Sequence, residues 1–382
     1  MSQAILLDTM SSAAALPAGV RRAPRAPQRK RPREFLDAFD ADGMFYDCFW
    51  HVDGRRVLLI GPPPVNTEAG YRLATFTALP SHTALKPRFH TSLSVMITEL
   101  GNVPATSTAI EVKFGIDRVA LPIQPNLSRQ LAGKRLLFSM NKNNELAWIR
   151  EWAAFHAKLH GSDVVILFDN GSTAYPVEDI VETLRSVPGL THVAVPVWPH
   201  RFGRTDPAVK LNPYWAHFPQ IGSMSDVLRR YGTGAAGLLN ADIDELVEAP
   251  DGRSIYDLAS ATKHGLVVFR GRWIEATPHG DGTADHRDFG WRHPDAKRAL
   301  SRPNKWALDP RRDWVANLGV HPYWHWIAGR PMFSKVSPPG AFYWHFRGIS
   351  TNWKIARTAD FPPPEMLEED AALAAAFARA SA

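Results

Sequence analysis

The pattern of apolar and polar positions divides the chain into two parts with different predicted secondary structure. From Phe35 to about Gln130, short β-type runs such as 57–60 and 92–98 are separated by turns rich in Gly and Pro. Several short strands at this spacing are typical of a small β-sandwich. The pattern therefore predicts a β-rich accessory domain over residues 35–130, with residues 122–126 as the linker that follows its last strand.

Beyond the linker, apolar runs alternate with segments of helical periodicity. The run at 164–168 has no polar alternation, as expected for a strand that is covered on both faces. The predicted order is strand 135–140, helix 144–160 ending before Gly161, strand 164–168, helix 177–186 and strand 192–198. This βαβαβ order predicts an α/β domain over residues 131–360, built on a doubly wound parallel sheet. Residues 361–382 are expected to form a helical tail.

Three carboxylates follow the apolar run that begins at Leu238. If residues 238–246 form one strand, its period of two places Asp242 and Asp244 on one face and Glu245 on the other. Neighbouring carboxylates of this kind raise each other's pKa unless a cation neutralises them, and oxygen ligands suit Mg²⁺ or Mn²⁺. The alternative is an acidic strand end on a solvated turn.

The net charge of +6 is concentrated at the N-terminus. Residues 1–33 contain seven Lys or Arg residues and one acid, which accounts for the whole excess. The remainder is formally neutral, which argues against a nucleic-acid partner. We expect residues 1–34 to be a disordered basic leader, with attraction to an anionic membrane as the functional alternative. Cys48 is the only cysteine and no apolar run suits a membrane span, so we expect a cytoplasmic protein.

Polar clusters follow three predicted strands of the α/β domain. They are 141–145, 169–172 and 242–245. Ligands of doubly wound sheets bind beyond the carboxyl ends of the strands, so these clusters predict one site. The first strand is not followed by Gly-x-Gly-x-x-Gly, which makes a nicotinamide-dependent oxidoreductase a poor candidate.

An ordered set of motifs resembles glycosyltransferase family 92 and its bacterial family-2-like relatives. The resemblance covers about 135–354 and is carried by Asn141-Lys142-Asn143-Asn144-Glu145, Glu151-Trp152-Ala153-Ala154-Phe155-His156, Leu167-Phe168-Asp169-Asn170-Gly171-Ser172, Asp242-Ile243-Asp244-Glu245, Asn304-Lys305-Trp306, Tyr343-Trp344-His345-Phe346-Arg347 and Trp353-Lys354. It implies a GT-A fold and inverting sugar transfer from a nucleotide-sugar donor to a glycan or lipid-linked acceptor. We expect a UDP-sugar as the donor and a role in the synthesis of a surface polysaccharide.

The resemblance also implies roles for single residues. Asp169 would contact the nucleoside, Asp242 the ribose or the metal, and Asp244 and His345 would bind Mn²⁺ or Mg²⁺ directly. A metal of this kind neutralises the departing nucleoside diphosphate. The chain departs from the pattern in the sequence Asp-Asn-Gly-Ser at 169–172, and residues 35–130 match no domain of the family.

Each candidate also has a structural alternative. Asp169 could cap the following turn, Asn141 and Glu145 could cap a helix, and His345 could be a packed core residue. Cations after the last strands could bind the donor diphosphate or lie on the surface; these are Lys305, Arg347 and Lys354.

An inverting transfer also needs a general base beside the acceptor hydroxyl. Asp288 and Glu275, in a polar segment that we interpret as an acceptor-side loop, are the candidates. Trp324 is one of several tryptophans that could stack on a sugar or pack in the core. Two other functions remain open: a metal-dependent nucleotidyltransferase or phosphohydrolase, and a non-catalytic protein that binds a sugar or a nucleotide.

Overall fold

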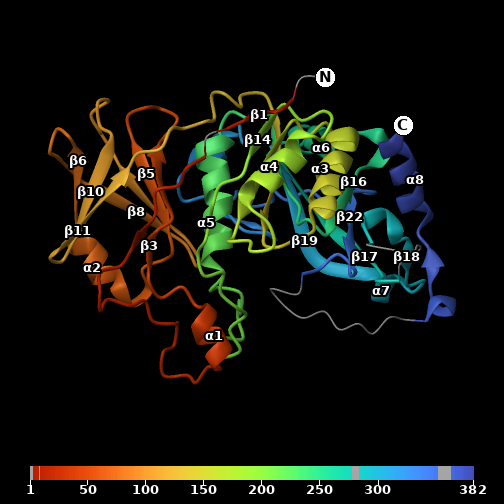
Figure 1. Cartoon of the computed structure of the whole chain (residues 1–382), viewed down its shortest axis with the longest axis horizontal. Helices are drawn as coiled ribbons and strands as arrows, with labels where there is room; N and C mark the ends of the chain where they lie inside the picture. The colour runs from red at the N-terminus through yellow and green to blue at the C-terminus, as the bar shows by residue number, and fades with distance from the viewer. Residues whose placement is uncertain (1–2, 8, 278–283, 352–362) are drawn as a thin grey trace.

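A nine-stranded mixed sheet forms the centre of the computed structural model, which describes residues 3–7, 9–277, 284–351 and 363–382 (Figure 1). In spatial order its strands are β1 (Ile5–Leu6), β14 (His192–Ala194), β13 (Val164–Asp169), β12 (Arg135–Asn141), β15 (Gly237–Asn240), β19 (Leu300–Leu308), β17 (Leu266–Ile274), β22 (Phe342–Phe346) and β16 (Glu245–Glu248). The protein is therefore of the mixed α/β class.

The half of the sheet from β1 to β15 is parallel. It contains the predicted βαβαβ unit, in which α3 (Leu146–His160) connects β12 to β13 and α4 (Val177–Arg185) connects β13 to β14. Gly161 ends α3 in the left-handed conformation, as predicted. The other half is not parallel throughout, because β19 runs antiparallel to both β15 and β17, and β16 runs antiparallel to β22.

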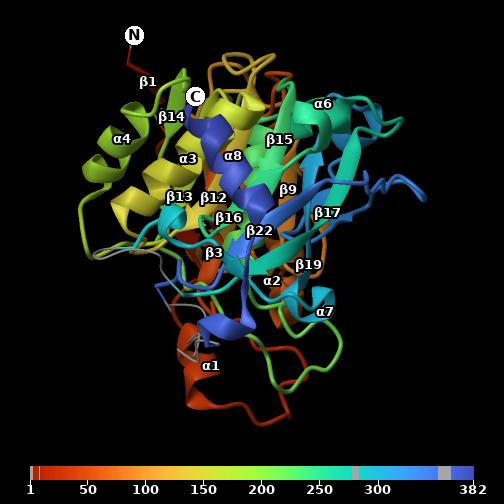
Figure 2. The ribbon, with the colours of Figure 1, turned by 90° about the vertical axis from the view of Figure 1, so that its right-hand side faces the viewer.

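Two hydrophobic cores lie on the two faces of this sheet. Along β13, Val165 and Leu167 face one core, whereas Val164, Ile166 and Phe168 face the other. The first core is covered by α3, α4, α6 (Ile255–Ser260) and α8 (Ala371–Ser381) (Figure 2). The second core is covered by α5 (Phe218–Asp226), which is labelled in Figure 1. The helical tail is thus present as α8, which packs against α3.

The β-rich region consists of two four-stranded antiparallel sheets. One contains β11 (Asp117–Pro122), β10 (Ala109–Phe114), β6 (Thr75–Leu79) and β7 (Thr83–Leu85), and the other β4 (Asp47–Trp50), β5 (Val57–Gly61), β9 (Met96–Leu100) and β8 (Pro87–Thr91). Leu59 of β5 faces the core between the two sheets, but Leu58 and Ile60 face the second core, which contains α5. The accessory region therefore shares a core with the α/β body.

Residues 3–7 and 9–33 are ordered, which makes the prediction of a disordered leader wrong. β1 extends the parallel sheet beside β14, and Arg31 forms an ion pair with Asp206 (Nη2 to Oδ2, 2.9 Å) in which both side chains are almost fully buried. The guanidinium of Arg22 donates to three backbone carbonyl oxygens of the β-rich region. The basic residues that suggested a charged tail thus include internal partners of folded segments.

The remaining elements are short. The short α-helices are α1 (Arg33–Ala38), α2 (Glu68–Leu73) and α7 (Ala296–Ala299), and a π-helix spans Val227–Tyr231. 3₁₀ turns lie at Val65–Thr67, Pro250–Gly252, His286–Asp288, Asp313–Ala316 and Pro364–Met366. The short strands pair as β2 (Ala14–Ala15) with β3 (Gly43–Phe45), β18 (Trp291–Arg292) with β23 (Glu368–Glu369), and β20 (His321–Pro322) with β21 (Ile327–Ala328). Among the described helices, none combines the length and the apolar character that crossing a bilayer requires.

Candidate metal and ligand site

A turn brings the three carboxylates of the central acidic motif together. β15 ends at Asn240 and β16 begins at Glu245, so residues 238–246 do not form one strand, and the condition on which Glu245 was placed opposite Asp242 is not met. The backbone N–H of Asp242 donates to Glu245 Oε2 (2.8 Å), and the N–H of Glu245 donates to the carbonyl oxygen of Asp242 (3.0 Å). The turn therefore folds Glu245 back to the same side as Asp242, and the predicted placement of Glu245 on the opposite face is wrong.

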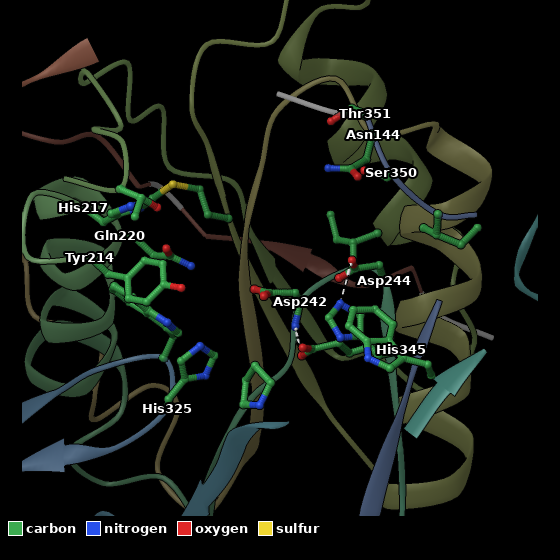
Figure 3. A pocket seen from close by; sticks show the side chains of 18 residues that line it. Asn144, Tyr214, His217, Gln220, Asp242, Asp244, His325, His345, Ser350 and Thr351 are labelled. Carbon is green, nitrogen blue, oxygen red and sulfur yellow. Dashed lines mark hydrogen bonds and ion pairs between the residues drawn. The ribbon is translucent and has the colours of Figure 1, made fainter. Parts of the chain in front are cut away.

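Asp244, Glu245 and His345 form a cluster with the composition of a metal site. One potential ligand atom from each lies within 4.8 Å of the others. His345 comes from β22, directly opposite Glu245 in the antiparallel register, and its Nε2 is 3.2 Å from Asp244 Oδ2 (Figure 3). Two carboxylates and an imidazole are a donor set that suits Mn²⁺ and also Mg²⁺. Asp242, also predicted as a ligand, lies outside this group of three.

Lys305 provides a cation beneath the cluster. Its side chain is fully buried, and Nζ is 2.9 Å from Asp242 Oδ2 and 2.9 Å from Glu245 Oε2. Burial alone would lower the pKa of Lys305, but the two carboxylates outweigh burial and hold this pKa above its ordinary value. Burial also raises the pKa of Glu245, against the opposing effect of the Lys305 ammonium. Three carboxylates and one ammonium leave two formal negative charges, which matches one divalent cation.

The ring of His345 is held on both its face and its edge. Trp273 stacks on it, with ring centroids 4.0 Å apart and an interplanar angle of 19°, and Ser301 Oγ lies 3.0 Å from Nδ1. The Arg347 guanidinium in turn lies 4.1 Å from the centroid of the Trp273 ring and forms an ion pair with Glu275 (3.1 Å). These contacts leave Nε2 directed toward Asp244, as a metal ligand requires.

The cluster forms one wall of a cavity of about 340 Å³, within the range of small-molecule sites. Asp242 and Asp244 lie on this wall, and Asn144, Ser350 and Thr351 lie at one end (Figure 3). The opposite wall comes from the segment before α5, from α5 itself and from the hairpin between β20 and β21; its residues include Tyr214, His217, Gln220 and His325. Trp324 of the same hairpin also lines the cavity, and its ring contacts that of Tyr214.

The predicted donor-binding residues at the first two strand ends mainly contact one another. Asn141 at the end of β12 is fully buried, and its Nδ2 donates to Asp169 Oδ1 (3.0 Å). Asp169 also accepts hydrogen bonds from the backbone and hydroxyl of Ser172, which is the turn-capping alternative. Glu145 is the N-cap residue of α3 but makes no side-chain capping bond. None of these side chains lines the cavity within the described part of the chain.

The remaining predicted residues are also outside the described cavity lining. Asp288 Oδ2 accepts the backbone N–H of Asp285 (2.7 Å) in a capping box, so its carboxylate has a structural partner. Glu275 and Lys305 are buried in ion pairs, and Arg347 stacks on Trp273. Lys354 lies outside the described residues.

The prediction missed Glu245 as a cluster member, and Tyr214, Gln220 and His325 as cavity residues. The position of Glu245 beside Asp244 in the sequence indicated a third carboxylate ligand, but the assumption of a continuous strand placed its side chain on the opposite face. The other three lie in irregular segments or at a helix start, where periodicity carries no information about a site.

Comparison of the sequence with protein-family models found no matching family, and comparison with curated proteins found no match.

Proposed function

We propose that this chain is a metal-dependent glycosyltransferase of the GT-A fold, which transfers a sugar from a nucleotide-sugar donor to a hydroxyl of a glycan or lipid-linked acceptor with inversion. The observation that carries this proposal is the approach of Asp244 and His345, with Glu245, at the wall of a cavity. These residues come from positions about a hundred apart in the sequence, and the family resemblance implies metal binding for two of them.

The charge distribution supports a metal at this position. None of the described cavity-lining residues is Lys or Arg, and the nearby Lys305 ammonium already pairs with Asp242 and Glu245. A donor diphosphate therefore needs a cation from another source. When bound by Asp244, Glu245 and His345, Mn²⁺ or Mg²⁺ would neutralise the negative charge that develops on the leaving nucleoside diphosphate.

The chain's own residues have distinct tasks in this proposal. Lys305 limits the repulsion among the three carboxylates, so that the turn at 242–245 keeps one geometry. Trp273 and Ser301 hold the imidazole of His345. The cavity walls restrict water around the donor, which favours transfer to an acceptor over hydrolysis.

Two variants test the metal ligands. Asp244→Asn keeps the size of the side chain, and His345→Phe keeps a ring against Trp273 while removing both nitrogens. Each should abolish tight Mn²⁺ binding in calorimetry and lower nucleoside diphosphate release from UDP-sugars by about 10²-fold or more, since a charge aimed at the leaving group contributes roughly 3 kcal/mol. The double variant should be scarcely worse than either single one, because both residues act through one ion.

Asp117→Asn, at an exposed strand position, is the matched control and should behave as the wild type. Normal turnover in both site variants would refute the proposal, and so would wild-type turnover that persists in a chelator. Release of pyrophosphate in place of nucleoside diphosphate would instead identify a nucleotidyltransferase. Metal-dependent binding of nucleotide-sugars without transfer or hydrolysis would identify a non-catalytic binding protein.

A further inference from the structure

The cavity wall opposite the acidic cluster combines aromatic rings with the side chains of Gln220 and His325, each of which has a hydrogen-bonding atom with no partner among the described residues. Tyr214, Gln220 and His325 lie across the cavity from Asp244 and His345 (Figure 3). The hairpin that carries Trp324 and His325 is tied to the sheet, because Asn240 at the end of β15 donates from Nδ2 to the carbonyl oxygen of Trp324 (2.7 Å). This part of the wall is therefore attached to the strand that leads into the acidic turn.

Gln220 presents its side-chain amide to the cavity. Only 6% of the residue is exposed, and the amide has no hydrogen-bond partner among the described residues. Its atoms are not fully shielded, so a ligand can reach them from the cavity, and a ligand that displaces water there must supply a hydrogen bond in its place. A side chain of this kind at the first turn of α5 indicates a group that is satisfied when a ligand enters.

His325 presents a hydrogen-bond acceptor to the same space. Its Nδ1 lies 2.8 Å from the backbone carbonyl oxygen of Asn304, which can only accept, so Nδ1 carries the proton. The second nitrogen, Nε2, then holds a lone pair and has no partner among the described residues. Burial lowers the pKa of His325 to about 3, so the ring is neutral near pH 7 and this lone pair is retained.

The aromatic side chains and the charge of this wall define the ligand class. Tyr214 and Trp324 meet edge to face, with ring centroids 6.1 Å apart, and Tyr214 is 47% exposed. Aromatic faces beside hydrogen-bonding groups suit the C–H faces and hydroxyl edges of sugar rings. Without a Lys or Arg among the described lining residues, the wall offers no ion pair to an acidic ligand.

We propose that Tyr214, Gln220, Trp324 and His325 form the acceptor subsite, which binds a neutral pyranoside with a hydroxyl donating to His325 Nε2 and another bonded to the Gln220 amide. This inference rests on the proposed glycosyltransferase function. It makes the acceptor an uncharged sugar residue and places it across the cavity from the metal ligands.

Fluorine NMR of protein labelled with fluorotryptophan tests the subsite without measuring activity. The resonances of Trp324 and Trp273 are assigned among the thirteen tryptophans from the variants Trp324→Phe and Trp273→Phe. The probes are the methyl glycosides of glucose, galactose and mannose, and methyl glucuronide as the charged analogue. At least one neutral glycoside should shift the Trp324 resonance in a saturable way, and the glucuronide should bind more weakly.

Gln220→Leu and His325→Phe should each weaken this binding about 3- to 10-fold, the usual loss for one hydrogen bond, whereas Gln130→Leu on the exposed surface should leave it unchanged. If no neutral glycoside shifts the Trp324 resonance, or if both site variants bind as the wild type does, the subsite is wrong. Stronger binding of the glucuronide would also overturn it.

The same spectra separate this inference from the proposed function. Paramagnetic Mn²⁺ bound at His345 should broaden the resonance of Trp273, which stacks on that ring. Broadening without a glycoside response would retain the metal site and reject the subsite. A glycoside response without Mn²⁺ broadening would reject the metal site while leaving a sugar-binding wall. Broadening that persists in Gln220→Leu and His325→Phe also shows that these variants are folded.

Discussion

Replacing Lys305 by Met should destabilise the protein strongly, because this change removes the ion-pair partner of the buried Glu245 carboxylate. The Lys305 side chain is fully buried, and the Glu245 side chain is 2% exposed, so water cannot take the place of the ammonium there. The Asp242 side chain is 29% exposed and can be hydrated in part. Breaking a buried pair by removing one partner costs about 3–5 kcal/mol. With one of the two carboxylates partly hydrated, we expect about 3 kcal/mol.

Urea unfolding at neutral pH, followed by circular dichroism, measures this loss. The double variant Lys305→Met/Glu245→Gln should recover more than half of it, because the buried negative charge is then absent as well. Lys297→Met is the control, because it removes the same kind of side chain at an exposed position of helix α7. It should change the free energy of unfolding by less than about 0.5 kcal/mol.

Two results would refute this reasoning. A loss below about 1 kcal/mol for Lys305→Met would show that the turn relaxes and exposes Glu245 to water. A double variant that is no more stable than Lys305→Met would show that the lysine acts through packing of its aliphatic stem and not through charge.

Three further predictions concern the rest of the molecule. Arg31→Met should lower the free energy of unfolding in urea by about 3 kcal/mol because it leaves the buried Asp206 carboxylate without its ion-pair partner. Arg33→Met, at an exposed position, should be nearly neutral, and equal effects of the two variants would show that residues 1–33 do not pack on the folded body. Residues 35–130 expressed alone should aggregate or melt without cooperativity, because the face of the β5 sheet that packs against α5 becomes exposed to water. Sedimentation and circular dichroism measure this, and a sharp melt of a monomer would contradict it. Burial lowers the pKa of His156 to about 3 and of His160 to about 4, so both rings are neutral in the folded protein and take up protons on unfolding below about pH 6.5. The free energy of unfolding should therefore fall as the pH is lowered from about 6.5 to 4, by up to about 1.4 kcal/mol per pH unit for each ring. A His160→Gln variant whose urea midpoints keep the full pH slope of the wild type would contradict this.

The local pattern of the sequence was sufficient for the repeating elements. Uninterrupted apolar residues at 164–168 predicted a buried strand, and the structure confirms it together with the helix that Gly161 ends. The β-rich character of residues 35–130 also follows from short β-type runs between turns rich in Gly and Pro. These features were predictable because periodicity records which face of each element is buried, and this requirement is independent of the partner that covers the face.

The sequence also indicated part of the candidate site. Asp244 and His345 were selected from an ordered set of motifs, and the fold brings them to 3.2 Å. Their neighbours were misassigned, because a strand was extended through residues 241–244, where the chain turns. A single turn reversed the placement of Glu245, since a change of one position moves a side chain to the other face of a strand.

Only the tertiary structure decided the role of the charged residues. From the sequence, Lys305 is expected either at a diphosphate or on the surface, but it lies buried against two carboxylates. Arg31 is expected in a disordered leader, but it pairs with Asp206. In each case the partner lies far away in the sequence. The sequence shows that a residue carries a charge, but it does not show whether that charge lies on the surface or in the core. Whether a cation binds a ligand or stabilises the fold depends on burial and on the distance to its counter-charge, and both quantities exist only after the chain has folded.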